Sequence, residues 1–316
     1  ACLHLRFSTA AWQAAQFGYY CTAQHLNFPD RRVYEMASQD TGALGELYQD
    51  DNFYSWQVDE SYASATAYAE YLTSFYQPTS AVDFGCGRGA WLKAMHDHGV
   101  ERLVGADGPW NSQDKMIDQA IAFRGLDLND PAPAFGDETF DLAISLEVFE
   151  HLEPRNSERV ADCFTALAPV LMFGGAFVHQ IGQNHINEQL HSYWAKLFLA
   201  RGFEVFDVFR PKFWGDERVC YFYQQNTYLY VRKGHPLGQK LREMGHAPVE
   251  NLNWLDAVHP VMLYRYVSWT IPHRLRMHFA QNAPAPLRWV AGVVRQILGV
   301  KPIRGAEGKG TAAQAA

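Results

Sequence analysis

The sequence predicts an α/β protein in which seven strands form a mostly parallel sheet with helices on both faces. From about Ser80, short apolar or β-branched segments alternate with longer amphipathic ones, which is the pattern of a parallel sheet flanked by helices. The composition, with 48% hydrophobic and 19% charged residues, is ordinary for a globular protein. The length of 316 residues allows one large domain with additions.

The candidate strands are short runs rich in apolar and β-branched residues. They cover residues 81–84, 102–106, 122–126, 141–146, 176–181, 204–209 and 227–232. Helices are expected between them at 90–98, 156–167 and 191–201. Ahead of the first strand, apolar residues from Tyr62 to Phe75 recur at helical spacing. Residues 60–75 are therefore predicted to form a leading helix that ends before Pro78.

The composition divides the chain into four parts. We expect an N-terminal segment of uncertain structure at 1–47, a main domain at 48–234, a basic helical extension at 235–304 and a disordered tail at 305–316. The boundary after residue 234 is indicated by the glycine and proline of the sequence KGHP, which follows the last predicted strand.

The formal net charge of −7 conceals two regions of opposite sign. From residue 257 onward eight Lys or Arg residues accompany the single Glu307, which leaves −14 on residues 1–256. An acidic body argues against a nucleic-acid partner, because phosphate binding needs a basic face. The extension interleaves basic residues with aromatic ones such as Trp269 and Trp289, which is typical of helices that bind membrane surfaces. The alternative is that it packs on the acidic body or on another subunit.

The sequence contains no run of about 20 apolar residues and no signal peptide pattern. Its five cysteines are scattered, without the spacing of a metal site or a disulfide framework. We therefore expect a cytoplasmic protein, with peripheral contact at the inner face of the membrane left open. The oligomeric state stays open as well.

A glycine-rich turn follows the first predicted strand. Residues 83–89 (DFGCGRG) lead from strand to helix, and glycine allows positive φ and a close approach of backbone N–H groups to a ligand. The spacing GxGxG differs from the GxGxxG of dinucleotide-binding turns. Asp83, at the start of this turn, would attract a cationic ligand.

Acidic residues also follow the next two predicted strands. Asp107 and Gly108 end the second strand, at the position where an acidic residue receives two ribose hydroxyls in nucleotide-binding βαβ folds. Asp127 and Leu128 follow the third strand. Their carboxylate and apolar side chain suit the amino group and the ring of an adenine.

Residues 80–151 resemble, motif by motif and in order, the cofactor half of class I S-adenosylmethionine-dependent methyltransferases, which have a Rossmann-like fold. The resemblance implies that S-adenosylmethionine is the cofactor. The residues that it places around the cofactor are Asp83, Gly85, Cys86, Gly87, Gly89, Asp107, Gly108, Asp127, Leu128, Leu146 and Glu147.

A second motif lies where the fourth predicted strand ends. In residues 145–152 (SLEVFEHL), Glu147, Glu150 and His151 resemble the ExxEH pattern with which ubiquinone-pathway and small-RNA 2′-O-methyltransferases hold a divalent metal. His185 would be the fourth ligand, and this donor set suits a borderline metal. Many metal-free relatives also carry a Glu-His pair here. No metal is therefore expected, and these four residues stay as candidate ligands.

The polar run after the fifth predicted strand, residues 182–189 (GQNHINEQ), is too polar for an ordinary short connection. Methyl transfer to a hydroxyl group requires removal of a proton, and histidine is suited to that task near neutral pH. We predict that His185 is the base, that Glu188 orients it or binds the acceptor, and that His151 assists. The alternative is that this run only caps the helix beginning near His191.

Further segments resemble a bacterial subgroup of methyltransferases associated with polysaccharide and cell-surface glycan biosynthesis. They are FYSWQVDESYASA, NHINEQLHSYWAKLF, RPKFW and RVCYFYQQNTYLYV, within residues 48–233. This resemblance implies O-methylation of a sugar hydroxyl in a glycan or glycan precursor. The aromatic residues that would stack on sugar faces, or belong to the core instead, are Trp194, Trp214, Tyr221, Phe222 and Tyr223.

Three alternative functions stay open. The first is an O-methyltransferase whose acceptor is an aromatic or quinone-like metabolite, and the ExxEH pattern favours this alternative. The second is a non-catalytic cofactor-binding protein, and the third is a nicotinamide-dependent oxidoreductase.

Overall fold

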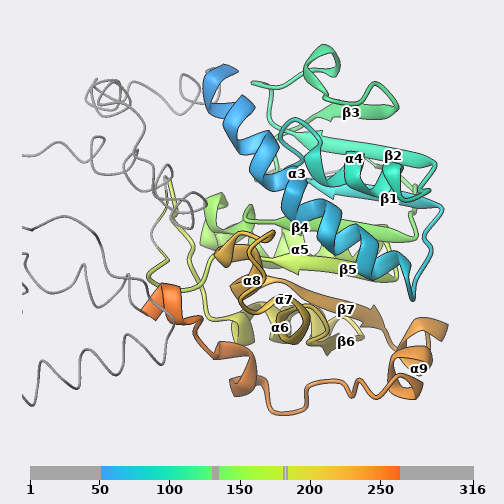
Figure 1. Cartoon of the computed structure of the whole chain (residues 1–316), viewed down its shortest axis with the longest axis vertical. Coiled ribbons are helices and arrows are strands. Elements are labelled where there is room, and N and C mark those ends of the chain that lie inside the picture. The colour runs from blue at the N-terminus through green and yellow to red at the C-terminus, as the bar shows by residue number, and fades with distance from the viewer. Residues whose placement is uncertain (1–50, 130–134, 181, 183, 264–316) are drawn as a thin grey trace, which may run out of the picture. The chain divides into compact units, whose positions relative to one another are not determined.

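The computed structural model describes residues 51–129, 135–180, 182 and 184–263 (Figure 1). Within them, seven strands form one sheet in the order β3-β2-β1-β4-β5-β7-β6. Strand β7 runs antiparallel to β5 and β6, and the other neighbouring strands are parallel. The predicted Rossmann-like, mostly parallel sheet of seven strands is confirmed.

The elements have the following bounds. The strands are β1 Ser80–Phe84, β2 Arg102–Asp107, β3 Ile121–Gly125, β4 Leu142–Leu146, β5 Val170–Gly174, β6 Phe203–Phe206 and β7 Tyr228–Arg232. The helices are α3 Asp51–Thr73, α4 Ala90–Asp97, α5 Ser157–Leu167, α6 His191–Ala200, α7 Arg210–Phe213, α8 Tyr221–Asn226 and α9 Pro236–Glu243. A short 3₁₀ helix at Phe149–His151 follows β4.

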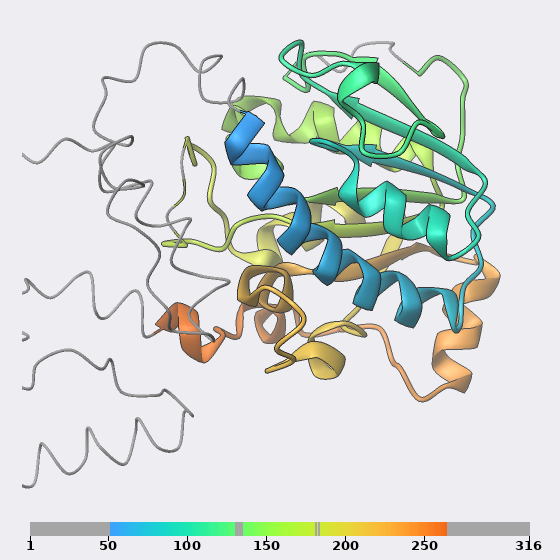
Figure 2. The same ribbon diagram turned by 45° about the horizontal axis from the view of Figure 1, so that its top comes forward.

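Strands β1, β4 and β5 are buried along their whole length, and each contributes to two hydrophobic cores. In β5, for example, Val170 and Met172 join the core under α3 and α4, whereas Leu171 and Phe173 join the core under α5 and α6. This alternation follows from the period of two along a strand. Figures 1 and 2 show α3 and α4 lying across the same side of the sheet.

Helix α3 is the leading helix, and it links several elements over one face. The ring of Tyr68 is fully buried and stacks on Phe213 and Phe209, with ring centroids 4.4 and 4.9 Å apart. It also meets the edge of Trp91 on α4 at 5.4 Å. Its hydroxyl group donates to the Tyr223 carbonyl oxygen of α8 at 2.9 Å. The aromatic segment around α7 and α8 is therefore part of this core.

The predicted fifth strand, residues 176–181, is wrong. The strand is Val170–Gly174, which pairs with β4 and β7. Two apolar runs follow each other here, separated by two glycines, and only the first lies fully buried between neighbouring strands. A Cβ on Gly174 would lie 3.1 Å from the Asn226 carbonyl oxygen, so the strand ends in close contact with α8. The second run begins the long connection that leads to α6.

The described part of the predicted C-terminal extension begins with α9, whose Leu237 and Leu241 are buried in the core. The described residues up to Met262 form one compact unit, and a second unit starts at Leu263. The rest of the predicted basic extension, the tail at 305–316 and the segment 1–47 lie outside the described residues. Among the described helices, none is long and apolar enough to cross a membrane.

Candidate functional site

The glycine turn between β1 and α4 fits tightly between other parts of the chain. Gly85, Gly87 and Gly89 have φ values of 81°, 52° and 87°, which favour glycine. A Cβ on Gly85 would lie 2.4 Å from Val148 Cγ2, and one on Gly89 would lie 2.6 Å from Ile121 Cδ1. Because glycine has no Cβ, the backbone at Gly85 can pack directly against Val148, in the segment that follows β4.

Two of the predicted cofactor carboxylates are buried beside this turn. Asp83 is 2% exposed, and burial together with the nearby charge of Asp107 holds its pKa well above the ordinary value. Both oxygens of Asp107 accept backbone N–H bonds, from Gly87 and Gly108, each at 2.6 Å. Burial raises the pKa of Asp107 as well. Two buried carboxylates with raised pKa values would be stabilised by a cationic ligand. S-adenosylmethionine carries positive charge at its sulfonium and ammonium groups.

Trp110 and Asn111 also belong to this side of the site, although no sequence pattern singled them out. The Trp110 ring fills the space beside Gly108, where a Cβ would lie 2.2 Å from it. Asn111 is 6% exposed and donates from Nδ2 to the carbonyl oxygen of Gly87. Cys86, a predicted cofactor residue, is buried in the same region.

The predicted adenine residues lie farther out. The Asp127 side chain is exposed, and its Oδ1 accepts the Asn129 N–H at 2.8 Å, whereas Leu128 is 8% exposed. Leu146, the last residue of β4, is 7% exposed. The next residue, Glu147, lies inside the site.

Glu147 is fixed by two side-chain amides. Its Oε2 accepts from Gln180 Nε2 at 2.5 Å, and its Oε1 accepts from Asn226 Nδ2 at 2.6 Å. Burial raises the pKa of Glu147 to about 8, although both amide donors act to lower it. The sequence offered no signal for either amide.

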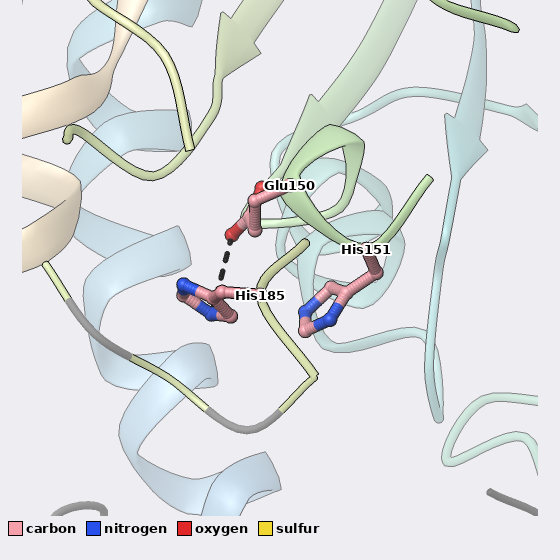
Figure 3. Close-up of side chains that lie close together, drawn as sticks. All are labelled: Glu150, His151 and His185. Atoms are coloured by element: carbon pink, nitrogen blue, oxygen red, sulfur yellow. Dashed lines mark ion pairs between the residues drawn. The ribbon is translucent and has the colours of Figure 1, made fainter. Parts of the chain in front are cut away.

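Glu150, His151 and His185 form a compact cluster (Figure 3). One potential ligand atom from each lies within 4.8 Å of the others. The two imidazole rings are nearly perpendicular, with centroids 4.9 Å apart. The four predicted metal candidates are therefore reduced to these three, because the carboxylate of Glu147 is bound to amides and is not part of the cluster.

The cluster contains a buried carboxylate whose oxygens lack hydrogen-bond partners. Glu150 is 0% exposed, and neither of its oxygens has a hydrogen-bond partner. Burial and the charge of Glu147 hold its pKa well above the ordinary value. For His151, burial and the neighbouring His185 lower the pKa to about 4. Unpaired buried carboxylates are costly, so Glu150 is either neutral or close to a cation.

The predicted partnership of His185 with Glu188 is present. His185 Nδ1 lies 2.8 Å from Glu188 Oε1, and the His185 side chain is 6% exposed. Its Nε2 lies 3.9 Å from Glu150 Oε1. A Cβ on residue 182 would lie 2.0 Å from this Nε2, so the His185 ring can occupy this position only because residue 182 is glycine.

The backbone around this site is strained. Among the described residues other than glycine, positive φ occurs at Glu147, His179 and Asn184, with values of 59°, 66° and 55°. Such conformations cost about 1–3 kcal/mol each and persist where surrounding contacts impose them. Here the N–H groups of Ile186 and Asn187 donate to the Glu150 carbonyl oxygen at 2.8 and 2.9 Å. These bonds hold the loop that carries His185, which we call the histidine loop, against the segment that follows β4.

The predicted aromatic residues have different environments. Trp194 is 1% exposed and belongs to the core under α5 and α6, and Tyr223 is 5% exposed and belongs to the core under α3. Tyr221 is buried and Phe222 is partly buried. Trp214 is 39% exposed. Core packing therefore accounts for Trp194 and Tyr223.

A family described as a methyltransferase domain matches residues 56–210, just under half of the chain. No match was found among curated proteins. The matched range includes the glycine turn, the carboxylates and the histidine loop described above. The domain match and the sheet topology support a class I methyltransferase. The chain is an S-adenosylmethionine-dependent methyltransferase.

Several solved structures are similar to this chain at low identity. One is a complex of the Haloferax volcanii Trm112 methyltransferase activator with a methyltransferase, with a TM-score of 0.45, 20% identity and coverage of 61% of this chain and 99% of that chain. A second is an O-methyltransferase family protein from Burkholderia thailandensis, with a TM-score of 0.44, 12% identity and coverage of 59% and 61%. A third is an S-adenosylmethionine-dependent methyltransferase from Archaeoglobus fulgidus, with a TM-score of 0.38, 17% identity and coverage of 44% and 68%.

We expect Asp107→Ala to weaken binding of S-adenosylmethionine about tenfold or more, because a carboxylate that receives ribose hydroxyls contributes about 1.5–3 kcal/mol. Isothermal titration calorimetry measures this effect, and a thermal melt checks that the variant is folded. Asp162→Ala is the matched control, since Asp162 is an exposed carboxylate on α5. Unchanged affinity in folded Asp107→Ala protein would remove Asp107 from the cofactor site.

Proposed function

We propose that the protein is an O-methyltransferase that acts on a sugar hydroxyl of a glycan or glycan precursor, with His185 as the base. The observation that carries this proposal is the hydrogen bond between His185 Nδ1 and Glu188 Oε1, at 2.8 Å. This pair lies beside the end of β4, on a polar loop whose backbone is bonded to Glu150.

The hydrogen bond determines which nitrogen can act. A neutral imidazole donates from one nitrogen and accepts at the other. With the Nδ1 proton held by Glu188, Nε2 keeps its lone pair and can take the proton of an acceptor hydroxyl. The cofactor supplies an electrophilic methyl group. The task of this chain is to bind the acceptor oxygen near that group, accept its proton at His185 and keep water out.

For the cofactor, we propose the residues found at the carboxyl edge of the sheet. The glycine turn and Asp83 would face the methionine part, Asp107 the ribose, and Glu147 the sulfonium. Asp127 and Leu128, at the rim, would receive the adenine. Asp83 and Asp107 support this placement, because they are buried carboxylates with raised pKa values and are suited to a cationic ligand.

A neutral, hydroxyl-rich acceptor suits the charge of this site. The carboxylate of Glu188 lies beside His185, so an anionic acceptor such as a nucleic-acid strand would be repelled. Carboxylates are also good acceptors for sugar hydroxyls. The resemblance of the HINEQ, RPKFW and QQN segments to methyltransferases of glycan biosynthesis favours sugars over aromatic or quinone-like metabolites.

A metal-assisted version of the same reaction is the second candidate, and the unpartnered carboxylate of Glu150 favours it. One carboxylate and two imidazoles are a reasonable donor set for Mn²⁺ or Zn²⁺. Glu188 would then support the ligand His185 from its other nitrogen, as carboxylates often do behind metal-bound histidines. A bound cation would lower the pKa of an acceptor hydroxyl group.

We expect His185→Ala to bind S-adenosylmethionine normally and to lose about 10²–10⁴-fold in methyl transfer, because the base acts on the acceptor. Transfer of labelled methyl groups to a panel of sugar nucleotides and lipid-linked sugars identifies the acceptor and measures the rate. Glu188→Gln keeps the size of the side chain but loses its charge, so an intermediate rate is expected. Turnover of His185→Ala within about threefold of wild type would exclude the base role.

Metal binding has its own test, which needs no acceptor. If the cluster is a metal site, the protein binds about one Mn²⁺ or Zn²⁺, and Glu150→Gln weakens this binding at least tenfold, since even supporting residues of metal sites contribute about 10–100-fold. Calorimetry with each metal salt measures the affinity. Glu158→Gln, an exposed change on α5, is the control. If neither metal binds the wild-type protein, His185 is left with the base role alone.

A further inference from the structure

Glu147, Gln180 and Asn226 form a closed group of three side chains, which we call the amide clamp. Each carboxylate oxygen of Glu147 accepts from a different amide, at 2.5 Å from Gln180 and 2.6 Å from Asn226. Asn226 Nδ2 also donates to Gln180 Oε1 at 2.8 Å. Both amide residues are buried, with 6% and 0% exposure.

The orientation of the Asn226 amide is determined by its neighbours. Its two N–H bonds point to Glu147 and Gln180, and its Oδ1 lies 3.0 Å from His191 Nε2. Burial lowers the pKa of His191 to about 4, so the ring is neutral. Its Nε2 faces Asn226, while Nδ1 lies 3.0 Å from the Leu255 carbonyl oxygen and 3.2 Å from the Tyr228 hydroxyl group. A flipped amide would place Oδ1 against oxygens of Glu147 and Gln180, so the orientation with Nδ2 toward them is the one that favours Glu147 as a carboxylate.

The clamp lies next to the glycine turn. Strands β1 and β4 are neighbours, with Asp83 beside Ile144, so Glu147 follows at the same sheet edge. The nearest atoms to a Cβ on Gly85 belong to Val148, the residue after Glu147. Tyr223 lies close enough to feel the charges of both Asp83 and Glu147. A ligand seated on the turn therefore has Glu147 within reach.

We propose that Gln180 and Asn226 are positioning residues that hold Glu147 as a carboxylate facing the sulfonium of the cofactor. They thereby give the site its preference for cationic S-adenosylmethionine over the neutral product S-adenosylhomocysteine. This inference rests on the cofactor placement proposed above. Weak binding of the product would speed its release after each transfer.

The physical need for the clamp comes from the surroundings of Glu147. Its backbone has a φ of 59°, and burial alone disfavours a carboxylate there. The titratable groups that face it are Glu188, Glu150 and the phenols Tyr68 and Tyr223. The negative charge of Glu188 disfavours ionisation of Glu147, and Glu147 in turn raises the pKa of Glu150. Gln180 and Asn226 are the hydrogen-bond donors that favour the charged form of Glu147.

The test compares two ligands that differ by one methyl group and one charge. Calorimetry gives the affinities of S-adenosylmethionine and S-adenosylhomocysteine, and their ratio cancels contacts that both ligands share. We expect Glu147→Gln to lower the ratio about tenfold, as for the loss of a charge-assisted contact. Asn226→Ala and Gln180→Met should each lower it several-fold. In the Glu147→Gln background, neither change should lower the ratio further.

The same titrations across pH give a second readout. In wild type the ratio should rise with pH through the region around the Glu147 pKa of about 8, because the cation prefers the ionised form. Asn226→Ala removes a donor to the carboxylate, so the rise should move to higher pH. It should be absent in Glu147→Gln.

Gln225→Ala is the matched control, because Gln225 is a buried amide on the same helix that bonds to Ala257 and His259 and not to Glu147. It should leave the ratio unchanged. The proposal is overturned if Asn226→Ala and Gln180→Met weaken both ligands equally, or if their effect on the ratio persists with Glu147→Gln. If wild type binds neither ligand, the cofactor placement fails instead. If one of the two amide variants, Asn226→Ala or Gln180→Met, does not fold, the affinity ratio of the other one tests the proposal.

Discussion

The site depends on the burial of several carboxylates at one edge of the sheet. Parallel strands end at the same edge, so acidic residues near the carboxyl ends of β1, β2 and β4 are brought together there. Asp83, Asp107, Glu147 and Glu150 all have raised pKa values, with burial as the largest cause. Carboxylates in this position favour a cation, and the cofactor of a class I methyltransferase is one.

The protein treats these carboxylates in different ways. Asp107 receives two backbone N–H groups, and Glu147 receives two side-chain amides. Neither oxygen of Glu150 has a hydrogen-bond partner, and the nearby backbone N–H groups of Glu150 and Ala176 only partly offset the effect of burial on its pKa. Hydrogen bonds to the charged form favour ionisation, whereas burial without them favours the neutral acid. Two carboxylates three residues apart, on one short segment, are thus suited to different tasks, as in other sites where the environment separates paired acids.

The fold was largely predictable because its signals are local, and the residues proposed for the cofactor carry local signals as well. Apolar strands, the glycine turn and an acid after each strand follow one another along the sequence. The fifth strand was placed wrongly because two apolar runs adjoin at Gly174, and only pairing with β4 and β7 distinguishes them. Gln180 and Asn226 were missed because they lie 33 and 79 residues from Glu147, and a buried amide has no characteristic spacing.

The two roles considered for His185 exclude each other at one atom. With Nδ1 bound to Glu188, the lone pair of Nε2 either takes a proton or binds a metal ion. Glu150, whose Oε1 lies 3.9 Å from this nitrogen, decides between them through its charge. As a neutral acid it needs no cation, and the nitrogen stays available to the acceptor hydroxyl. As a carboxylate it requires a positive partner, and within this cluster that partner would be a metal ion shared with His151 and His185.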